Sequence, residues 1–526
     1  MWDKCPLSLA MTAERQFIIH LLRAFFLICL DVMAFYTSLF VAWYIRDGIL
    51  PLVFNWSRSL QLFTAPGHSW FFTAPGHSWF FTAPGHSWLL GGLTENFSFG
   101  MYVGLWWVPV TYVSFNAYSG MYSARLPFWD DTRRLITSLT LIMLIVMMIV
   151  NIGQMSAEIS RVILVLLWCI SLVVFPVYRL LGKKTLFRFC VFKTKALILG
   201  AGNTGRLINQ WLAREKSIGI EVVGFLDDDQ EKINTLVDGK RVFGGIGDYA
   251  PLIKNLRTST VIIAMPSLGP KRISTLAFQL QLCIKDVMIV PDLYGVALLN
   301  TELLHLFYEE IFLLKIKNNL KFVKNRVIKR LFDIVSAIVL LPLLLIIVGI
   351  IGLLIKLESR GPVIYSHLRI GKGGKPFKCY KFRTMVKDAD AVLATLLKSN
   401  SKLKEWQQRY KLTNDPRVTR FGAFLRKTSL DELPQIFNVL KGEMSIIGPR
   451  PVTEHEVETY YKELAEACFS VLPGITGLWQ VSGRNDTTYD YRIRLDNWYI
   501  MNWSLWLDIV ILIKTISVVF FMKGVR

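Results

Sequence analysis

Long apolar runs dominate the first third of the chain. Four of them, each near or above the roughly 20 residues that a helix needs to cross a bilayer, lie at about 17–45, 99–120, 134–153 and 161–182. Few charged residues interrupt these runs, and hydrophobic residues make up 53% of the whole chain. The pattern predicts an integral membrane protein in which residues 1–189 form a region of four transmembrane helices.

Basic residues flank these segments unevenly. The loop around 121–134 and the stretch after 182 are rich in Lys and Arg, whereas the loops 46–98 and 154–160 are poor in both. Because basic loops stay on the cytoplasmic side of a membrane, we expect the N-terminus and everything after residue 182 to be cytoplasmic. No AxA-like cleavage site accompanies the first segment, so we expect no removable signal peptide.

The formal net charge of +21 fits positively charged cytoplasmic loops and attraction to anionic membrane lipid. Nucleic-acid binding would need a basic face with interleaved aromatic residues or a recognised motif, and the sequence contains neither. We therefore expect membrane lipid as a partner and no nucleic acid.

A tandem repeat occupies the loop between the first two apolar segments. FTAPGHSW occurs three times between Phe63 and Trp88 and brings in His68, His77 and His86. Metal binding by these histidines is one interpretation. Identical copies favour a recent duplication instead, and Pro-Gly in each copy favours turns. We predict an expanded periplasmic loop at 63–88.

The middle of the chain alternates strands and helices. An apolar strand ends at Leu199 and is followed by a turn containing Gly200, Gly202 and Gly205, which is the context of a dinucleotide-binding turn. Further strands at 221–226 and 260–264 predict a Rossmann-like parallel sheet in a cytoplasmic domain at 190–300. The glycines could bind NAD or another nucleotide, or the fold could serve scaffolding or regulation. We favour the second interpretation, because we find no residue suited to hydride transfer.

Another apolar run, at 334–355, has basic residues on both flanks and Pro342 inside it. A spanning helix would place one basic flank outside, and proline bends a helix. We therefore predict a linker at 301–325 and a re-entrant helix at 330–357 that enters the membrane and returns to the cytoplasmic face. A fifth spanning helix is the alternative. The apolar stretch 503–521 predicts a helix on the membrane surface.

Four polar clusters follow residue 360. Alternation in the strand-like run 377–385 places Lys381 and Arg383 on one face, which suits a phosphate or a solvated edge. Two prolines restrict the backbone around Arg450 and orient its guanidinium for a phosphoryl group. The turn-rich run 473–484 adds Arg484 as a candidate phosphate ligand.

The remaining cluster is the run Ser429-Leu-Asp-Glu-Leu-Pro434. Ser429 and Glu432 have the spacing of a capping box, so one interpretation is only a capped helix start. A helix N-terminus also keeps a carboxylate ionised and attracts phosphate. Asp431 would then be a nucleophile at phosphorus, with Asp431 and Glu432 as ligands for Mg²⁺.

Together these runs resemble the bacterial sugar transferase family, the polyprenyl-phosphate hexose-1-phosphate transferases of the large monotopic form. Five motifs in the family order carry the resemblance across 325–526: Lys329-Arg-Leu-Phe-Asp333, Tyr380-Lys-Phe-Arg383, Ser429-Leu-Asp-Glu-Leu-Pro434, Gly448-Pro-Arg-Pro451 and Pro473-Gly-Ile-Thr-Gly477. The runs 477–486 and 502–506 are most similar to members that transfer galactose 1-phosphate. Family members usually bend the membrane helix at a Ser-Pro about one turn beyond Pro342.

The resemblance implies a mainly helical catalytic domain at 326–526 on the cytoplasmic face of the bacterial inner membrane. It implies that Asp431 attacks a UDP-hexose, that UMP leaves, and that undecaprenyl phosphate then takes the hexose phosphate from the aspartyl intermediate. Glu432 would carry Mg²⁺. The phosphate ligands would be Lys381, Arg383, Arg450 and Arg426, the last on the lipid phosphate.

Two other functions stay open at this point. The domain at 190–300 could make the chain a membrane-tethered oxidoreductase or nucleotide sensor. The chain could also be an inactive scaffold for glycan assembly, although a scaffold has no need of adjacent Asp431 and Glu432. Pairing of the Rossmann-like domains would give a homodimer.

Overall fold

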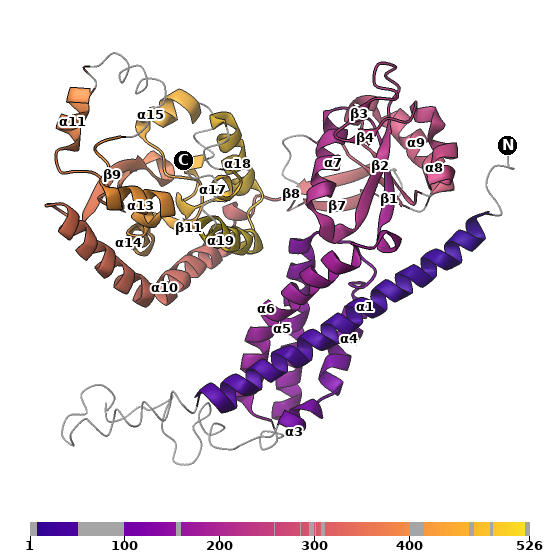
Figure 1. The fold of residues 1–526 in the computed structure, drawn as a ribbon, viewed down its shortest axis with the longest axis horizontal. Coiled ribbons are helices and arrows are strands. Elements are labelled where there is room, and N and C mark those ends of the chain that lie inside the picture. The colour runs from indigo at the N-terminus through magenta and orange to yellow at the C-terminus, as the bar shows by residue number, and fades with distance from the viewer. Residues whose placement is uncertain are drawn as a thin grey trace. The chain divides into compact units, whose positions relative to one another are not determined.

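A computed structural model describes most of the chain. The described residues are 8–50, 99–153, 159–256, 258–284, 286–293, 299, 301–306, 311–396, 398, 415–461, 468–483 and 488–520. They belong to two compact units, Met1–Asp292 and Leu293–Arg526, and Figure 1 shows the elements of both. The predicted repeat loop at 63–88 lies outside the described residues.

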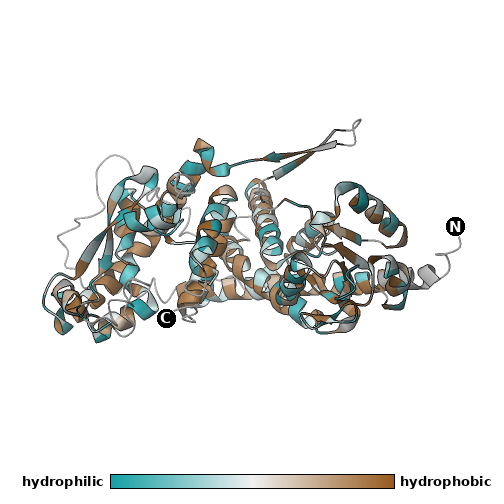
Figure 2. Ribbon diagram, turned by 90° about the horizontal axis from the view of Figure 1, so that it is seen from above, coloured by the Kyte–Doolittle hydropathy of each residue, from teal (hydrophilic) through white to brown (hydrophobic). Residues whose placement is uncertain are grey.

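The first unit begins with a bundle of apolar helices. Its elements are α1 (Ser8–Tyr44) with a π-helical turn η1 (Ile45–Ile49), α3 (Phe99–Val103), α4 (Trp107–Tyr118), α5 (Phe128–Ile152) and α6 (Arg161–Leu186). Stretches of α1 with η1, α5 and α6 are long and apolar enough to cross a membrane. In Figure 2 long stretches of helix are brown, the colour of hydrophobic residues.

The predicted second segment, 99–120, is helical but divided. Residues 104–106 separate α3 from α4. Gly104 at the break disfavours a continuous helix, since glycine lowers helix propensity by about 1 kcal/mol relative to alanine. The 12 residues of α4 rise only about 18 Å, less than the roughly 30 Å of a bilayer core. Within the described residues, the bundle therefore has three long helices and one broken one.

Charged side chains inside the bundle are paired. Arg179 donates two hydrogen bonds to Asp31, at 2.6 and 2.9 Å, and Tyr122 donates a third at 2.8 Å. Lys183 lies 2.8 Å from Asp131. Such pairing is what permits ionisable groups within apolar helices, and it joins α1, α5 and α6 to the loop after α4.

A parallel sheet follows the bundle within the first unit. Its strands are β1 (Thr194–Leu199), β2 (Ile220–Leu226), β5 (Thr260–Ile263) and β6 (Asp286–Ile289), in the order β2-β1-β5-β6. Buried apolar side chains pack on both of its faces. The remaining elements of this part are η4 (Cys190–Phe192), α7 (Asn203–Arg214), η5 (Lys216–Ile218), β3 (Leu236–Val237), β4 (Lys240–Arg241), η6 (Ile246–Asp248), α8 (Tyr249–Leu256), η7 (Pro266–Leu268) and α9 (Pro270–Cys283). The predicted parallel sheet is confirmed.

One arginine joins the bundle to the sheet. Arg125, in the loop after α4, donates to the carbonyls of Gly219 at 2.8 Å, Ile218 at 3.1 Å and Phe192 at 3.2 Å. The bundle and the sheet accordingly form one compact unit, although the sequence suggested a boundary at residue 190.

The second unit starts with a hairpin where the sequence predicted a linker. Strands β7 (Thr301–Leu306) and β8 (Ile311–Ile316) pair antiparallel. The later elements are η8 (Asn319–Lys321), α10 (Val323–Glu358), β9 (Ile364–Ile370), η9 (Lys372–Gly374), β10 (Pro376–Phe382), α11 (Ala389–Leu396), α13 (Arg420–Thr428), η10 (Leu430–Glu432), α14 (Gln435–Lys441), β11 (Ser445–Ile447), α15 (Glu454–Glu456), η11 (Val457–Tyr461), β12 (Gly474–Thr476), α17 (Leu478–Val481), α18 (Tyr489–Met501) and α19 (Leu505–Phe520).

Helix α10 is continuous through Pro342, and Figure 1 shows its axis bending into two arms. Both arms are attached to the same unit. Lys329, on the first arm, lies 2.8 Å from Asp508 of α19, while Ile351 and Ile355 of the second arm pack with Phe382 and Leu425. The apolar middle of the helix is largely exposed.

Candidate active site

The two acidic residues lie in a sharp turn between α13 and α14. Ser429 ends α13 with a positive φ of 59°, and Asp431 and Glu432 occupy the 3-10 turn η10. The predicted capping box is wrong, because Ser429 makes no side-chain cap and the regular helix begins only at Gln435. The left-handed residue instead reverses the chain so that both carboxylates come close to strand β10.

Two cations lie against these carboxylates. Lys381 Nζ is 2.7 Å from Glu432 Oε1 and 3.9 Å from Asp431 Oδ2. Arg450 Nη2 is 3.4 Å from the same Glu432 oxygen. The carboxylate side chains are only 14% and 16% exposed, so water screens these interactions weakly.

Burial raises the pKa of Asp431, and the neighbouring Glu432 raises it further, while Lys381, Arg426 and Arg450 oppose the rise. The sequence suggested that a helix N-terminus keeps Asp431 ionised. In the structure desolvation is the larger effect, and the surrounding cations stabilise the charged form. The protonation of Asp431 therefore depends on these three side chains.

Asn438 fixes strand β10, which carries Lys381, against helix α14. The Asn438 side chain accepts a hydrogen bond from Tyr380 N at 3.1 Å and donates one to Lys378 O at 2.8 Å. Asn438 is fully buried and lies on α14, directly after the acidic turn. Because both ends of the amide are used, the strand and the helix are fixed relative to one another.

The turn that carries Arg450 follows strand β11. Lys329 and Tyr499 both donate to Ile447 O, at 2.9 and 3.2 Å, and Asp333 accepts from Ile446 N at 3.1 Å. A Cβ atom on Gly448 would lie 2.7 Å from Leu472 O. The motifs around Lys329 and Gly448 thus position Arg450 through the backbone of β11.

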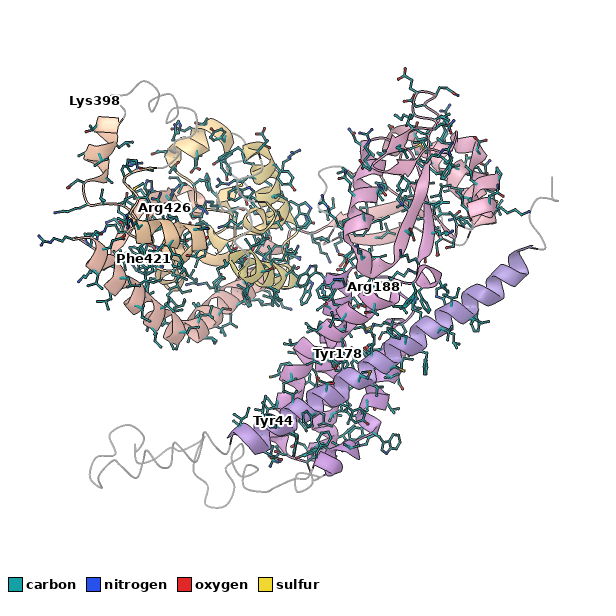
Figure 3. All side chains as sticks on the ribbon, viewed as in Figure 1. Tyr44, Tyr178, Arg188, Lys398, Phe421 and Arg426 are labelled. Atoms are coloured by element: carbon teal, nitrogen blue, oxygen red, sulfur yellow. The ribbon has the colours of Figure 1, made fainter. Side chains whose placement is uncertain are left out.

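The other predicted phosphate ligands are distributed differently. Arg383 lies away from the acids and donates to Ser359 O at 2.7 Å, at the end of α10. Strand β10 ends at Phe382, so the alternation that grouped Arg383 with Lys381 does not extend that far. Arg426 projects from α13 (Figure 3), donates to Thr384 Oγ1 at 2.9 Å, and contributes to the field at Asp431. Arg484 lies outside the described residues.

A magnesium site at Asp431 and Glu432 fits the chemistry of these residues. Among the described residues, no group of three or more His, Cys, Asp or Glu side chains could enclose a metal. Mg²⁺ in phosphoryl-transfer sites commonly uses one or two carboxylates and takes its other ligands from water and substrate phosphates. The adjacent carboxylates meet that requirement, and magnesium stays a prediction.

Sequence reasoning missed the residues that support the site. Asn438 has no signal beyond its place seven residues after Asp431, and Tyr499 and Asp508 are distant in sequence. Lys329 and Asp333 belong to one of the five family motifs, but the motif alone does not indicate what they contact. Their four-residue spacing places them on one face of α10, which would have indicated a shared partner.

The glycine turn of the first unit is built for close packing. Gly200 has a φ of +102°, and a Cβ on Gly205 would lie 2.0 Å from Gly200 O, whereas Gly202 has no neighbour within 4 Å. Asp227 Oδ2 accepts a hydrogen bond from Ala201 N at 2.8 Å. One backbone N–H of the loop therefore already donates to a carboxylate of the protein itself. Nucleotide binding at this turn stays a prediction.

Comparisons with known proteins agree with this division. Residues 324–522 match the family model of the bacterial sugar transferases, and residues 118–291 match a CoA-binding domain. A UDP-galactose-lipid carrier transferase of Erwinia amylovora is 36% identical over 79% of this chain and 85% of its own length. An undecaprenyl-phosphate galactose phosphotransferase of Salmonella typhimurium is 37% identical with the same coverage.

A solved UDP-D-quinovosamine 4-dehydrogenase from Vibrio fischeri is 29% identical over 19% of this chain and 80% of its own, with a TM-score of 0.18. The two transferase relatives extend over most of both chains, and the family model covers the acidic turn and its cations. The chain therefore belongs to the bacterial sugar transferase family of phosphoglycosyl transferases.

Proposed function

We propose that this membrane enzyme transfers hexose 1-phosphate, with galactose 1-phosphate as the favoured group, from a UDP-hexose to undecaprenyl phosphate and releases UMP. The product would begin the synthesis of an O-antigen, capsule or exopolysaccharide. The observation that carries the proposal is the pair Asp431 and Glu432, held in one turn with Lys381 and Arg450 against them. The relatives named for UDP-galactose and undecaprenyl phosphate support the same substrates.

In the first step an Asp431 carboxylate oxygen attacks the β-phosphorus of the UDP-hexose. The bond to the bridging oxygen breaks, UMP leaves with the electron pair, and an aspartyl phosphosugar forms. In the second step an oxygen of undecaprenyl phosphate attacks the same phosphorus, and the Asp431 carboxylate leaves. Neither step requires a proton, because the nucleophiles and the leaving groups are anions.

The side chains around Asp431 supply what this chemistry needs. Lys381 and Arg450 are placed to neutralise the diphosphate as charge moves to UMP. Arg426 lies close enough to influence the charge of Asp431, and we assign it to the lipid phosphate. Mg²⁺ at Glu432 and Asp431 would add Lewis-acid stabilisation of the phosphate oxygens.

Helix α10 suits an acceptor that lies in the bilayer. Its middle exposes large apolar side chains, including Val339 at 70%, Ile346 at 64% and Leu353 at 61%. Its two arms are both attached to the catalytic unit. We infer that the bent middle enters the inner membrane from the cytoplasmic face and returns, so that the acidic turn faces the lipid phosphates.

The test uses the full-length protein in detergent or nanodiscs. UMP release from UDP-galactose should require undecaprenyl phosphate for continued turnover, and Asp431→Asn should abolish it. Asp490→Asn, at an exposed position of α18, is the matched control and should keep wild-type activity. Wild-type rates in Asp431→Asn would eliminate the assigned role.

Sugar identity needs its own measurement. UDP-galactose, UDP-glucose and their N-acetylated counterparts should be compared in the same UMP-release assay. We expect the highest kcat/KM with UDP-galactose. A preference for another sugar would correct the hexose and leave the phosphosugar transfer intact.

A further inference from the structure

An arginine that the sequence did not single out lies on the same face of a hairpin as Lys381. Strands β9 and β10 pair antiparallel, with Tyr365 opposite Lys381 and Arg369 opposite Phe377. Residues two apart on a strand share a face, as do residues directly opposite each other on paired strands. Arg369 therefore belongs to the face that carries Lys381. It stands about 14 Å along the strand from Tyr365.

The turn that carries Arg450 is attached beside Arg369. Ile370 N donates to Val452 O at 2.8 Å, so the chain just after Arg450 pairs with the end of β9. Burial lowers the pKa of Arg369, Glu456 opposes this change, and the positive charge of Arg450 lowers the pKa further. Two guanidinium groups are therefore held near one another, and an anion between them would relieve their repulsion.

Glu456 fixes the direction of the Arg369 guanidinium. Its Oε2 lies 3.2 Å from Arg369 Nη1 and accepts from Thr453 N at 2.7 Å, while its Oε1 accepts from the Tyr489 hydroxyl at 3.0 Å. Among the described residues, Nε and Nη2 of Arg369 have no protein partner. The Arg369 side chain is 23% exposed. One edge of the guanidinium is thus fixed, and its other donors remain available to a ligand.

We propose that Arg369, together with Arg450, binds the α-phosphate of the UDP-hexose, an inference that rests on the proposed function. In that function the β-phosphorus lies at Asp431, beside Lys381. The α-phosphate is the next charged group of the donor, and Arg369 offers a cation farther along the same face. A guanidinium can donate two parallel hydrogen bonds to a phosphate, and such charge-assisted bonds are stronger than those between neutral groups.

The position of Arg369 argues against a role at the lipid phosphate. Strand β9 begins at Ile364, shortly after the end of α10, and Arg369 stands near the opposite end of the strand. Arg426 lies on α13, whose Leu425 packs with the second arm of α10. The acceptor is expected to approach along α10, so Arg426 suits its phosphate better than Arg369 does.

The kinetic test removes the charge of Arg369. Arg369→Gln should raise the inhibition constant of UMP and the KM for UDP-galactose by about tenfold or more, because charge-assisted hydrogen bonds to the phosphate are lost. The inhibition constant of uridine, which has no phosphate, should not change. Arg369→Lys should recover part of the loss, since lysine keeps the charge without the planar fork.

Lys378→Gln is the matched control. It also removes one positive charge from the hairpin, but Lys378 is exposed and lies on the opposite face of β10 from Lys381. The inhibition constant of UMP and the KM for UDP-galactose should keep their wild-type values in this variant.

Each other result overturns the inference. Equal increases for UMP and uridine would place Arg369 at the nucleoside, and a higher KM for UDP-galactose with an unchanged constant for UMP would place it at the hexose. A higher KM for undecaprenyl phosphate alone would assign Arg369 to the lipid. Unchanged kinetic constants with a lower melting temperature would limit it to folding. The proposed function is tested separately, since it fails only if the wild-type protein releases no UMP from any UDP-hexose.

A second measurement uses the wild-type protein and so does not depend on folding of Arg369→Gln. Phenylglyoxal modifies accessible arginine side chains, and the rate of modification at Arg369 is followed by mass spectrometry of the digested protein. UMP should slow this modification, and uridine should not. An equal rate with and without UMP, or equal protection by uridine, would overturn the inference.

Discussion

Lys381→Met should shift the pH at which the enzyme becomes active. The substitution removes a cation 3.9 Å from Asp431 Oδ2 and 2.7 Å from Glu432 Oε1. At 3.9 Å a unit charge pair is worth about 1 kcal/mol at the dielectric constant of water and about 4 kcal/mol at the value typical near protein surfaces. Losing that attraction disfavours the charged carboxylate, so the pKa of Asp431, which burial already raises, should rise further in the variant.

The sign follows from the chemistry. In the proposed mechanism only the ionised Asp431 attacks phosphorus, so activity should be lost as the pH falls through its pKa. Raising that pKa moves the acidic limb of the kcat/KM profile upward. At a pH where the wild-type carboxylate is ionised and that of the variant is protonated, the variant should lose activity, by up to about tenfold for each 1.4 kcal/mol of lost attraction, and the activity should return as the pH is raised.

The assay is UMP release from UDP-galactose between about pH 5 and 9. Lys378→Met is the control, because Lys378 lies on the same strand and its side chain is exposed. An acidic limb that stays at the wild-type pH, with only a higher KM, would refute the reasoning. Lys381 would then act on the substrate phosphate alone and not on Asp431.

Three further predictions concern buried polar residues of the second unit. Asn438→Ala should lower kcat and the melting temperature together, since two backbone groups lose buried partners at about 1–3 kcal/mol each; unchanged kcat with lower stability would limit Asn438 to folding. Lys329→Met leaves Asp508 without its cation and should destabilise the unit by about 3–5 kcal/mol, measured by thermal unfolding; an unchanged melting temperature would contradict it. Burial raises the pKa of Asp496 to about 7. The protonated residue therefore favours folding at low pH, and this contribution to stability is lost as the pH rises toward about 7. Asp496→Asn should flatten the dependence of stability on pH between about pH 4 and 7, and an unaltered slope would exclude the role.

The grouping of the acidic turn with its cations could be predicted because these residues are contiguous or belong to short motifs. Asp431 and Glu432 are adjacent, and Lys381 and Arg450 stand in runs with strong local signals. Arg383 could not be placed in the same way. Its position depends on where β10 ends and on its hydrogen bond to Ser359 after α10. Both are set by tertiary packing and not by the local sequence.

Local patterns also failed where tertiary packing decides. Ser429 has the spacing of a capping box, yet the chain needs it in a left-handed conformation to turn between two helices. Strand β6 is only four residues long, and its continuous apolar run Val287-Met288-Ile289 cannot be told from a helix segment by periodicity alone. Strands β7 and β8 pair only with each other among the described strands. The sequence between them contains no turn motif, such as Asn-Gly, that would indicate a hairpin.

The central claim is that Asp431 becomes covalently attached to the phosphosugar. Wild-type protein should be mixed with UDP-galactose carrying radioactive β-phosphorus in the absence of undecaprenyl phosphate, and the labelled peptide identified. We predict one burst of UMP, label confined to the peptide containing Asp431, and release of that label on addition of undecaprenyl phosphate. Continued UMP formation in the presence of the lipid, with no label on the protein or with label at another residue, would contradict the account.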